Sequence, residues 1–223
     1  MPEKRAPFRG ALFDMDGVLL DSERTCVLAF NDTVQSFALP PMPDVALACI
    51  GLRSDGVRTK VSAALAGQVE YDAFYTAWGQ RISEAFTLGI PVKTDVFTLL
   101  DALKTQGTPC AVATSTRTAS AEAHLQKAGL RGYFKAVIGG EQVAKGKPAP
   151  DIYLMAAKVL GLSPQDCVAF EDSDPGTLAA IASGATVVQV PDVKPPSAAL
   201  LANGHFIATS VLVGARHVGL IAK

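Results

Sequence analysis

The stretch Phe8-Arg9-Gly10-Ala11-Leu12-Phe13-Asp14-Met15-Asp16-Gly17 decides the fold. Its apolar first part predicts a short buried strand, and two aspartates stand where that strand ends. In open parallel sheets, ligands bind beyond the carboxyl ends of the strands. The stretch therefore predicts a strand of the core and, directly after it, the first residues of a functional site.

Four later segments repeat this pattern of a short apolar run. They are separated by segments whose apolar residues have helical spacing, and they cover residues 110–113, 136–138, 167–170 and 186–190. Short strands that alternate with helices are typical of βαβ units, whose strands form a parallel sheet. We therefore predict an α/β fold with a Rossmann-like parallel sheet flanked by helices.

The chain between the first two predicted strands reads as helical throughout. One of its helices carries Phe74, Trp78 and Ile82 on a single stripe, which is typical of a small apolar core between helices. This block is predicted to be an all-helical cap domain inserted into the α/β core. The predicted boundaries are residues 19–89 for the cap and residues 1–18 with 90–223 for the core.

Composition excludes several classes of protein. Hydrophobic residues make up 49% of the 223 residues, which is too many for a disordered chain. The 20 Lys and Arg nearly balance the 21 Asp and Glu, so we expect no nucleic-acid partner. No apolar run suits a membrane span, no signal peptide is evident, and the four cysteines form no C-x-x-C pair. We expect a cytoplasmic protein with no membrane partner, as a monomer or weak dimer.

Polar side chains collect where the predicted strands end. Because the carboxyl ends of parallel strands meet at one edge of a sheet, these side chains are expected to lie together. They are Asp14 and Asp16 after the first strand, Thr114, Ser115 and Thr116 after the second, Glu171 and Asp172 after the strand near Val168, and Lys147 in a loop between them.

Carboxylates this close together raise one another's pKa values or require a compensating cation. Mg²⁺ suits them, because proteins usually hold it by one or two carboxylates together with water and substrate phosphate. We expect Asp14 and Asp172 to be ligands, with a backbone carbonyl from Asp16.

Hydroxyl groups near the same edge suit phosphate oxygens. Thr114 and Ser115 stand beside backbone N–H groups at the start of the next predicted helix, and such groups bind anions. Lys147 can neutralise both a phosphate and a nucleophilic carboxylate. Together these residues predict a site for phosphoryl transfer that works by positioning and charge stabilisation.

Four motifs in this order resemble those of the haloacid dehalogenase superfamily. Residues 13–23 resemble its first motif, Thr114 its second, Lys147-Pro148 its third and Glu171-Asp172 its fourth. The predicted helical insertion resembles the cap of the β-phosphoglucomutase-like subgroup. Each motif alone is a weak signal, whereas four in order along the whole chain are specific.

The resemblance implies a role for each matching residue. Asp14 would be the nucleophile that forms an aspartyl-phosphate, and Asp16 would be the general acid and base. An Asp at the second position favours phosphate esters, because dehalogenases of the superfamily lack it. Thr114, with Ser115 and Thr116 beside it, would bind the phosphoryl group, and Lys147 would hold that group against Asp14. The metal would be held by Asp14, Asp16 and Asp172, with help from Glu171.

A loop of the predicted cap carries Arg53, between Gly51 and the Ser54 that can cap the next helix. By resemblance this loop reads the leaving group of the substrate, although Arg53 also fits a solvated surface charge. In the mutase pattern an Arg stands one place further on, where this chain has Ser54. The departure favours hydrolysis over phosphate transfer between two hydroxyls.

The sequence thus predicts a Mg²⁺-dependent phosphatase of a small phosphorylated metabolite, most plausibly a sugar phosphate. One alternative is a phosphomutase of the β-phosphoglucomutase type. Another is a metabolite-binding protein that keeps the fold without catalysis. The intact set of acidic residues, threonine and lysine argues against the second alternative.

Overall fold

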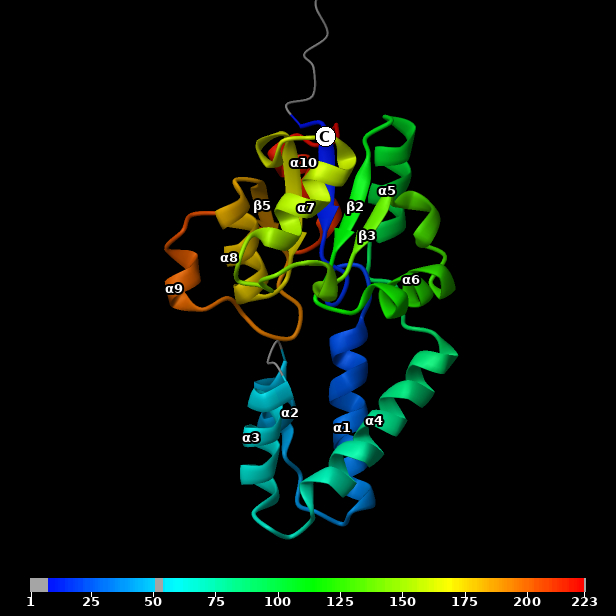
Figure 1. The fold of residues 1–223 in the computed structure, drawn as a ribbon, viewed down its shortest axis with the longest axis vertical. Coiled ribbons are helices and arrows are strands. Elements are labelled where there is room, and N and C mark those ends of the chain that lie inside the picture. Colours follow the sequence, from blue (N-terminus) through cyan, green and yellow to red (C-terminus); the bar gives the residue numbers. More distant parts are fainter. Residues whose placement is uncertain (1–7, 51–53, 223) are drawn as a thin grey trace, which may run out of the picture. The chain divides into compact units, whose positions relative to one another are not determined.

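The computed structural model describes residues 8–50 and 54–222, which divide into two compact units (Figure 1). One unit joins the residues up to Leu20 with those from Pro91 onward, and the other is Asp21–Ile90. Leu19 and Leu20 were placed in the cap by the sequence analysis. Both are buried, and backbone bridges join Leu20 to Asp16 and to Val92, so these leucines belong to the first unit.

The first unit contains the predicted parallel sheet. Within the described residues its strand order is β3-β2-β1-β4-β5-β6, and every pairing is parallel, which confirms the predicted α/β fold. The last strand was not predicted, because two residues carry no readable alternation. The strands are β1 (Gly10–Phe13), β2 (Cys110–Ala113), β3 (Ala136–Ile138), β4 (Cys167–Glu171), β5 (Thr186–Gln189) and β6 (Phe206–Ile207).

Helices pack against this sheet and complete its core. They are α5 (Val96–Thr105), α6 (Thr118–Lys127), α7 (Asp151–Leu160), α8 (Asp174–Ser183), α9 (Ala198–Leu201) and α10 (Val211–Val218), with short 3₁₀ turns at Arg131–Tyr133, Gly140–Gln142 and Pro164–Asp166. Helices α7 and α8 pack against each other and against the strands, and α5 packs against α10 (Figure 1). Leu12, Ala169 and Ile152 lie in the resulting apolar cluster.

The second unit is a group of helices with its own small core. Phe30, Phe74 and Trp78 are buried, and the ring of Phe30 meets the other two edge to face at centroid distances of 5.4 and 5.1 Å. This confirms the prediction that the aromatic stripe is a core. The helices are α1 (Ser22–Ser36), α2 (Pro43–Cys49), α3 (Ser54–Leu65) and α4 (Tyr71–Leu88).

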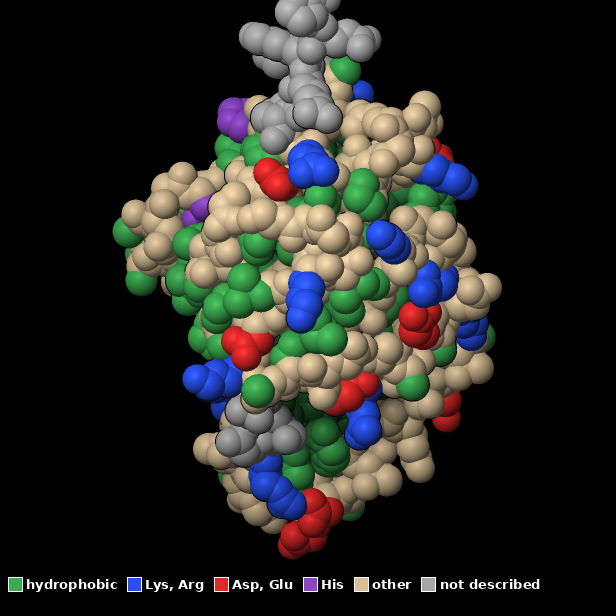
Figure 2. Space-filling model, turned by 45° about the horizontal axis from the view of Figure 1, so that its top comes forward, with side chains coloured by type: hydrophobic (Ala, Val, Ile, Leu, Met, Phe, Trp, Pro, Cys, Tyr) green, Lys and Arg blue, Asp and Glu red, His purple; other side chains and the backbone are tan. Residues whose placement is uncertain are grey.

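The surface carries charges of both signs. On the face that Figure 2 shows, the Lys and Arg side chains are scattered among Asp and Glu and do not gather into one basic patch. Among the described helices, none has the length and apolarity that a membrane crossing requires.

The register of the central strands determines where the polar residues fall. Phe13 at the end of β1 pairs with Val112 of β2 on one side and with Phe170 of β4 on the other. The Asp14 N–H continues this ladder by donating to the Phe170 carbonyl at 2.9 Å. The residues that follow the three strands therefore emerge side by side at one edge of the sheet.

Candidate active site

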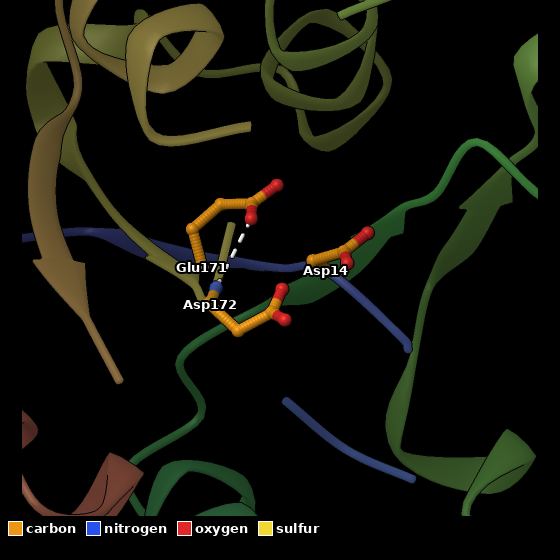
Figure 3. A group of neighbouring side chains, drawn as sticks. All are labelled: Asp14, Glu171 and Asp172. Carbon is orange, nitrogen blue, oxygen red and sulfur yellow. Dashed lines mark hydrogen bonds between the residues drawn. The ribbon is translucent and has the colours of Figure 1, made fainter. Parts of the chain in front are cut away.

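Three buried carboxylates meet at this edge. Asp14 follows β1, Glu171 ends β4 and Asp172 follows it, and each offers an oxygen within 4.8 Å of the others (Figure 3). At most 7% of any of the three residues is exposed. A cluster of this kind can hold a metal ion, because hard cations prefer carboxylate oxygens.

Lys147 is the cation that faces this cluster. Its Nζ donates to Asp14 Oδ1 at 2.7 Å and to Glu171 Oε1 at 2.5 Å, and only 7% of its side chain is exposed. Burial alone would lower the pKa of Lys147, but the two carboxylates outweigh it and hold the pKa above the ordinary value. Lys147 therefore stays charged and links the residue after β1 to the end of β4.

Glu171 is saturated with hydrogen-bond donors from the protein. Its Oε1 accepts from Lys147 and, at 2.8 Å, from the hydroxyl of the buried Tyr153. Its Oε2 accepts from the backbone nitrogens of Asp172 at 3.0 Å and Ser173 at 3.2 Å, and from the Ser173 hydroxyl at 3.0 Å. A carboxylate has about four lone-pair sites. Because its lone pairs are used in this way, Glu171 is better suited to positioning Lys147 and the Asp172 backbone than to direct contact with a metal.

Figure 3 shows the directions of the three carboxylates. The Glu171 carboxylate turns back toward the Asp172 nitrogen, whereas the Asp172 carboxylate extends on the opposite side of that backbone. Asp14 and Asp172 thus keep carboxylate oxygens that are not committed to the hydrogen bonds that hold Glu171, although all three residues belong to the cluster that could hold a metal ion. The sequence analysis assigned Glu171 a helping role at the metal, and its hydrogen bonds to the Asp172 and Ser173 nitrogens are one way in which it can help.

Negative charge exceeds positive charge in the site. Burial, opposed by Lys147 and reinforced by Glu171 and Asp16, raises the pKa of Asp14 from 3.8 to about 8. One lysine does not offset the carboxylates that surround it, so a further cation would stabilise the ionised form of Asp14. The buried oxygen donors and this excess charge both fit a small divalent ion.

Asp16 is the more accessible aspartate, and it faces the end of β2. Its Oδ2 accepts a hydrogen bond from the Thr116 hydroxyl at 2.8 Å and a longer one from the Thr114 hydroxyl at 3.4 Å. Thr114 is fully buried and also accepts from the Thr116 N–H at 3.1 Å. The structure therefore brings Asp16, Thr114 and Thr116 into one hydrogen-bonded group, while the Ser115 side chain is exposed.

The start of α6 differs from the expectation. The sequence analysis offered its N–H groups to phosphate, but the Thr118 N–H donates to both carboxylate oxygens of Glu141, at 2.9 and 3.2 Å. Glu141 follows Gly139 and Gly140, where a β-carbon would crowd Thr118 and Ser115. These glycines let the two loops approach, so that the Glu141 carboxylate accepts the Thr118 N–H at the start of α6.

Two glycines allow the backbone to come close to the carboxylates. Gly17 has φ +79°, and a β-carbon there would collide with the Asp172 carboxylate. Gly176, in the first turn of α8, leaves the space that the Glu171 carboxylate occupies. The helix itself is capped by Ser173, whose hydroxyl accepts from the Gly176 N–H at 3.2 Å.

Tyr153 and Gln189 were not predicted as part of the site. Tyr153 lies in the apolar stripe of α7, where an aromatic residue indicates core, and Gln189 lies at the end of the apolar strand β5. Both are fully buried and hydrogen-bonded to the Glu171–Asp172 segment. The one available signal was a polar atom inside an otherwise apolar run. Arg53, the predicted cap-loop residue, lies outside the described residues.

Comparisons with known proteins agree with this geometry. The family model described as haloacid dehalogenase-like hydrolase matches residues 11–190. The fructose-1-phosphate phosphatase of Escherichia coli (strain K12) is 33% identical over 185 residues, covering 82% of this chain and 96% of that protein. Hexitol phosphatase A of the same organism is 34% identical over 184 residues, covering 82% of each.

A solved structure resembles nearly the whole chain. It is a HAD family hydrolase from Deinococcus radiodurans R1 with bound phosphate and sodium, and it is 32% identical to this chain. The TM-score is 0.83, and the match covers 97% of this chain and 99% of the other. The similarity therefore extends over both units of the structure and over all four motifs.

Proposed function

This chain belongs to the haloacid dehalogenase-like hydrolases, and on that basis we propose that it is a Mg²⁺-dependent phosphatase of small phosphorylated sugars. The observation that carries the proposal is the buried contact of Lys147 with both Asp14 and Glu171 at the carboxyl edge of the sheet. It holds one carboxylate oxygen of Asp14 in place beside a permanent positive charge. That arrangement suits a carboxylate nucleophile for a phosphate ester.

Asp14 attacks the phosphorus, the bond to the ester oxygen breaks, and an aspartyl-phosphate forms. Asp16 donates a proton to the departing alkoxide and then takes one from the water that hydrolyses the aspartyl-phosphate. Thr116 and Thr114 orient Asp16 through their hydroxyl groups. Lys147 neutralises charge on the phosphoryl oxygens during both steps.

The metal is assigned to the buried oxygens of Asp14 and Asp172, with the backbone carbonyl of Asp16. Mg²⁺ is the ion that this set fits, because few carboxylates leave positions for water and for a phosphate oxygen. If bound by these residues, the ion would supply positive charge that stabilises the ionised Asp14 and the phosphate oxygens. Glu171 holds the Asp172 backbone and Lys147 in the positions that this assignment requires.

The substrate class is proposed from the two relatives, which are named as a fructose-1-phosphate phosphatase and a hexitol phosphatase. A sugar phosphate also fits the prediction from the sequence that a cap-loop cation, Arg53, recognises the leaving group. A cytoplasmic monomer or weak dimer remains our expectation for the state of the enzyme.

One assay distinguishes hydrolysis from phosphomutase activity. Purified protein with Mg²⁺ receives β-glucose 1-phosphate with a trace of the bisphosphate, and, in parallel, fructose 1-phosphate. We expect stoichiometric release of inorganic phosphate without glucose 6-phosphate, because Ser54 stands where the mutase pattern has an arginine able to hold a second phosphate. Rapid formation of glucose 6-phosphate with little free phosphate would instead establish a mutase.

A further inference from the structure

Gln189 is a buried polar residue at the end of an apolar strand. It is 0% exposed and pairs in register with Glu171 across the β4–β5 ladder. Burying an amide group without hydrogen bonds is unfavourable, because the group loses its bonds to water. The amide is instead bonded at both ends, since its Nε2 donates to the Asp172 carbonyl at 3.1 Å and its Oε1 faces His205 Nε2 at 2.7 Å.

These two contacts determine the orientation of the Gln189 amide. The Asp172 carbonyl can only accept, so the NH₂ group must face it and the amide oxygen must face His205. His205 Nε2 must then carry a proton and donate it. The other ring nitrogen, Nδ1, is buried and has no hydrogen-bond partner among the described residues. The Asp172 carbonyl thus excludes the flipped amide, in which two oxygens would face each other, and His205 is the donor that satisfies the Gln189 amide oxygen.

The hydrogen bonds of Gln189 help to fix the backbone of Asp172. Its backbone N–H is held by the Glu171 carboxylate at 3.0 Å, and its backbone carbonyl is held by Gln189. Both polar groups of this peptide segment are thus tied to fully buried side chains, one from β4 and one from β5. The direction of the Asp172 carboxylate depends on this backbone.

We infer that Gln189 and His205 form a positioning pair that sets the metal affinity of the site through Asp172. The inference rests on the proposed function in that it takes Asp172 as a metal ligand. Neither residue touches the phosphate or the reacting atoms, so both are positioning residues. Partners that orient a metal ligand from behind typically contribute about 10–100-fold to metal affinity or activity.

The test measures Mg²⁺ binding directly, by calorimetric titration of the substrate-free protein. Gln189→Leu keeps a side chain of similar size and removes both hydrogen bonds. We expect the Kd for Mg²⁺ to rise about tenfold or more, and the Mg²⁺ concentration for half-maximal activity to rise in parallel. Activity at saturating Mg²⁺ should recover most of the wild-type value, because the reacting groups are intact.

Two variants of His205 provide a second test, which can be used if Gln189→Leu fails to fold. His205→Leu removes the donor, and we expect a weaker Kd for Mg²⁺. His205→Gln keeps an N–H at the reach of Nε2, so it should retain the wild-type Kd. Gln106→Leu is the matched control, because Gln106 also donates to a backbone carbonyl, that of Leu220 at 3.2 Å, but near the start of β2 and away from the site.

The outcomes separate this inference from the proposed function. If the wild-type protein binds Mg²⁺ and the folded Gln189→Leu and His205→Leu variants bind it equally well, the positioning pair is refuted while the phosphatase assignment stands. Lower melting temperatures with unchanged Kd would also refute it, since they would indicate a purely structural role. If the wild-type protein binds no Mg²⁺ and releases no phosphate, the proposed function itself fails.

Discussion

Replacing Gly176 by alanine should displace the Glu171 carboxylate and so disturb the active site indirectly. Gly176 lies in the first turn of α8, and a β-carbon there would overlap the carboxyl carbon and both carboxyl oxygens of Glu171. These atoms are not the free end of a mobile side chain, because they are bonded to Lys147, Tyr153 and Ser173. The Glu171 carboxylate must therefore move, and its hydrogen bonds must break or lengthen.

The magnitude follows from two opposing effects. In a helix, Gly→Ala ordinarily stabilises by about 0.5–1 kcal/mol, because glycine loses more backbone freedom on folding. Loss of the hydrogen bond between Lys147 and Glu171 costs about 1.5–3 kcal/mol, as is usual for a bond to a charged group. The net effect is a destabilisation of about 0.5–2.5 kcal/mol. If Lys147 shifts as well, kcat/KM should fall about tenfold for each 1.4 kcal/mol of lost transition-state stabilisation.

The matched control is Gly79→Ala within α4, where a β-carbon would meet no atom within 4 Å. The assay compares the melting temperature and kcat/KM for an aryl phosphate in both variants. We expect the control to melt at or above the wild-type temperature with unchanged kcat/KM, and Gly176→Ala to lose both stability and activity. A Gly176→Ala protein as stable and as active as the control would refute the role given to Glu171.

Three further perturbations test the site. Saturating Mg²⁺ should raise the melting temperature of the wild-type protein, as expected for a ligand that binds the folded state, and Asp172→Asn should abolish the rise; an equal rise in the variant would remove Asp172 from the metal set. Replacing Mg²⁺ by Ca²⁺ should suppress phosphate release, because Ca²⁺ takes more ligands in a looser shell, and full activity with Ca²⁺ would contradict the assignment. Tyr153→Phe should lower kcat/KM severalfold, since Glu171 loses one of the bonds that hold it, worth about 1 kcal/mol; wild-type kinetics would leave Tyr153 a core residue.

The sheet could be predicted because most of its strands have a recognisable local sequence pattern. The segments at β1, β2, β3, β4 and β5 are short apolar runs between helical patterns, and their carboxyl ends meet at one edge in any parallel sheet. The same reasoning predicts from the sequence that Asp14, Lys147 and Asp172 lie together. Strand β6 and helices α9 and α10 were not predicted, because the first two are only two and four residues long and α10 follows an irregular segment.

The missed parts of the site depend on contacts between distant segments. The hydrogen bond from the Thr118 N–H to Glu141 could not be predicted from the sequence. The two residues are 23 positions apart and meet only because Gly139 and Gly140 let their loops approach. Gln189 and Tyr153 have the sequence surroundings of core residues. Their polar atoms are hydrogen-bonded to Asp172 and Glu171, which lie at the end of β4. Sequence patterns predict which element a side chain belongs to, whereas its direction depends on neighbours supplied by the tertiary fold.

The central claim is that the phosphoryl group passes through Asp14. The most direct measurement is an acid quench of the Mg²⁺-loaded protein during turnover of fructose 1-phosphate, followed by mass spectrometry of the peptide that contains Asp14. We predict one added phosphoryl group on Asp14 in the wild-type protein and none in Asp14→Asn, which should also lose turnover by several orders of magnitude. Turnover by Asp14→Asn within about tenfold of the wild-type rate, or a phosphoryl group on another residue, would contradict the account.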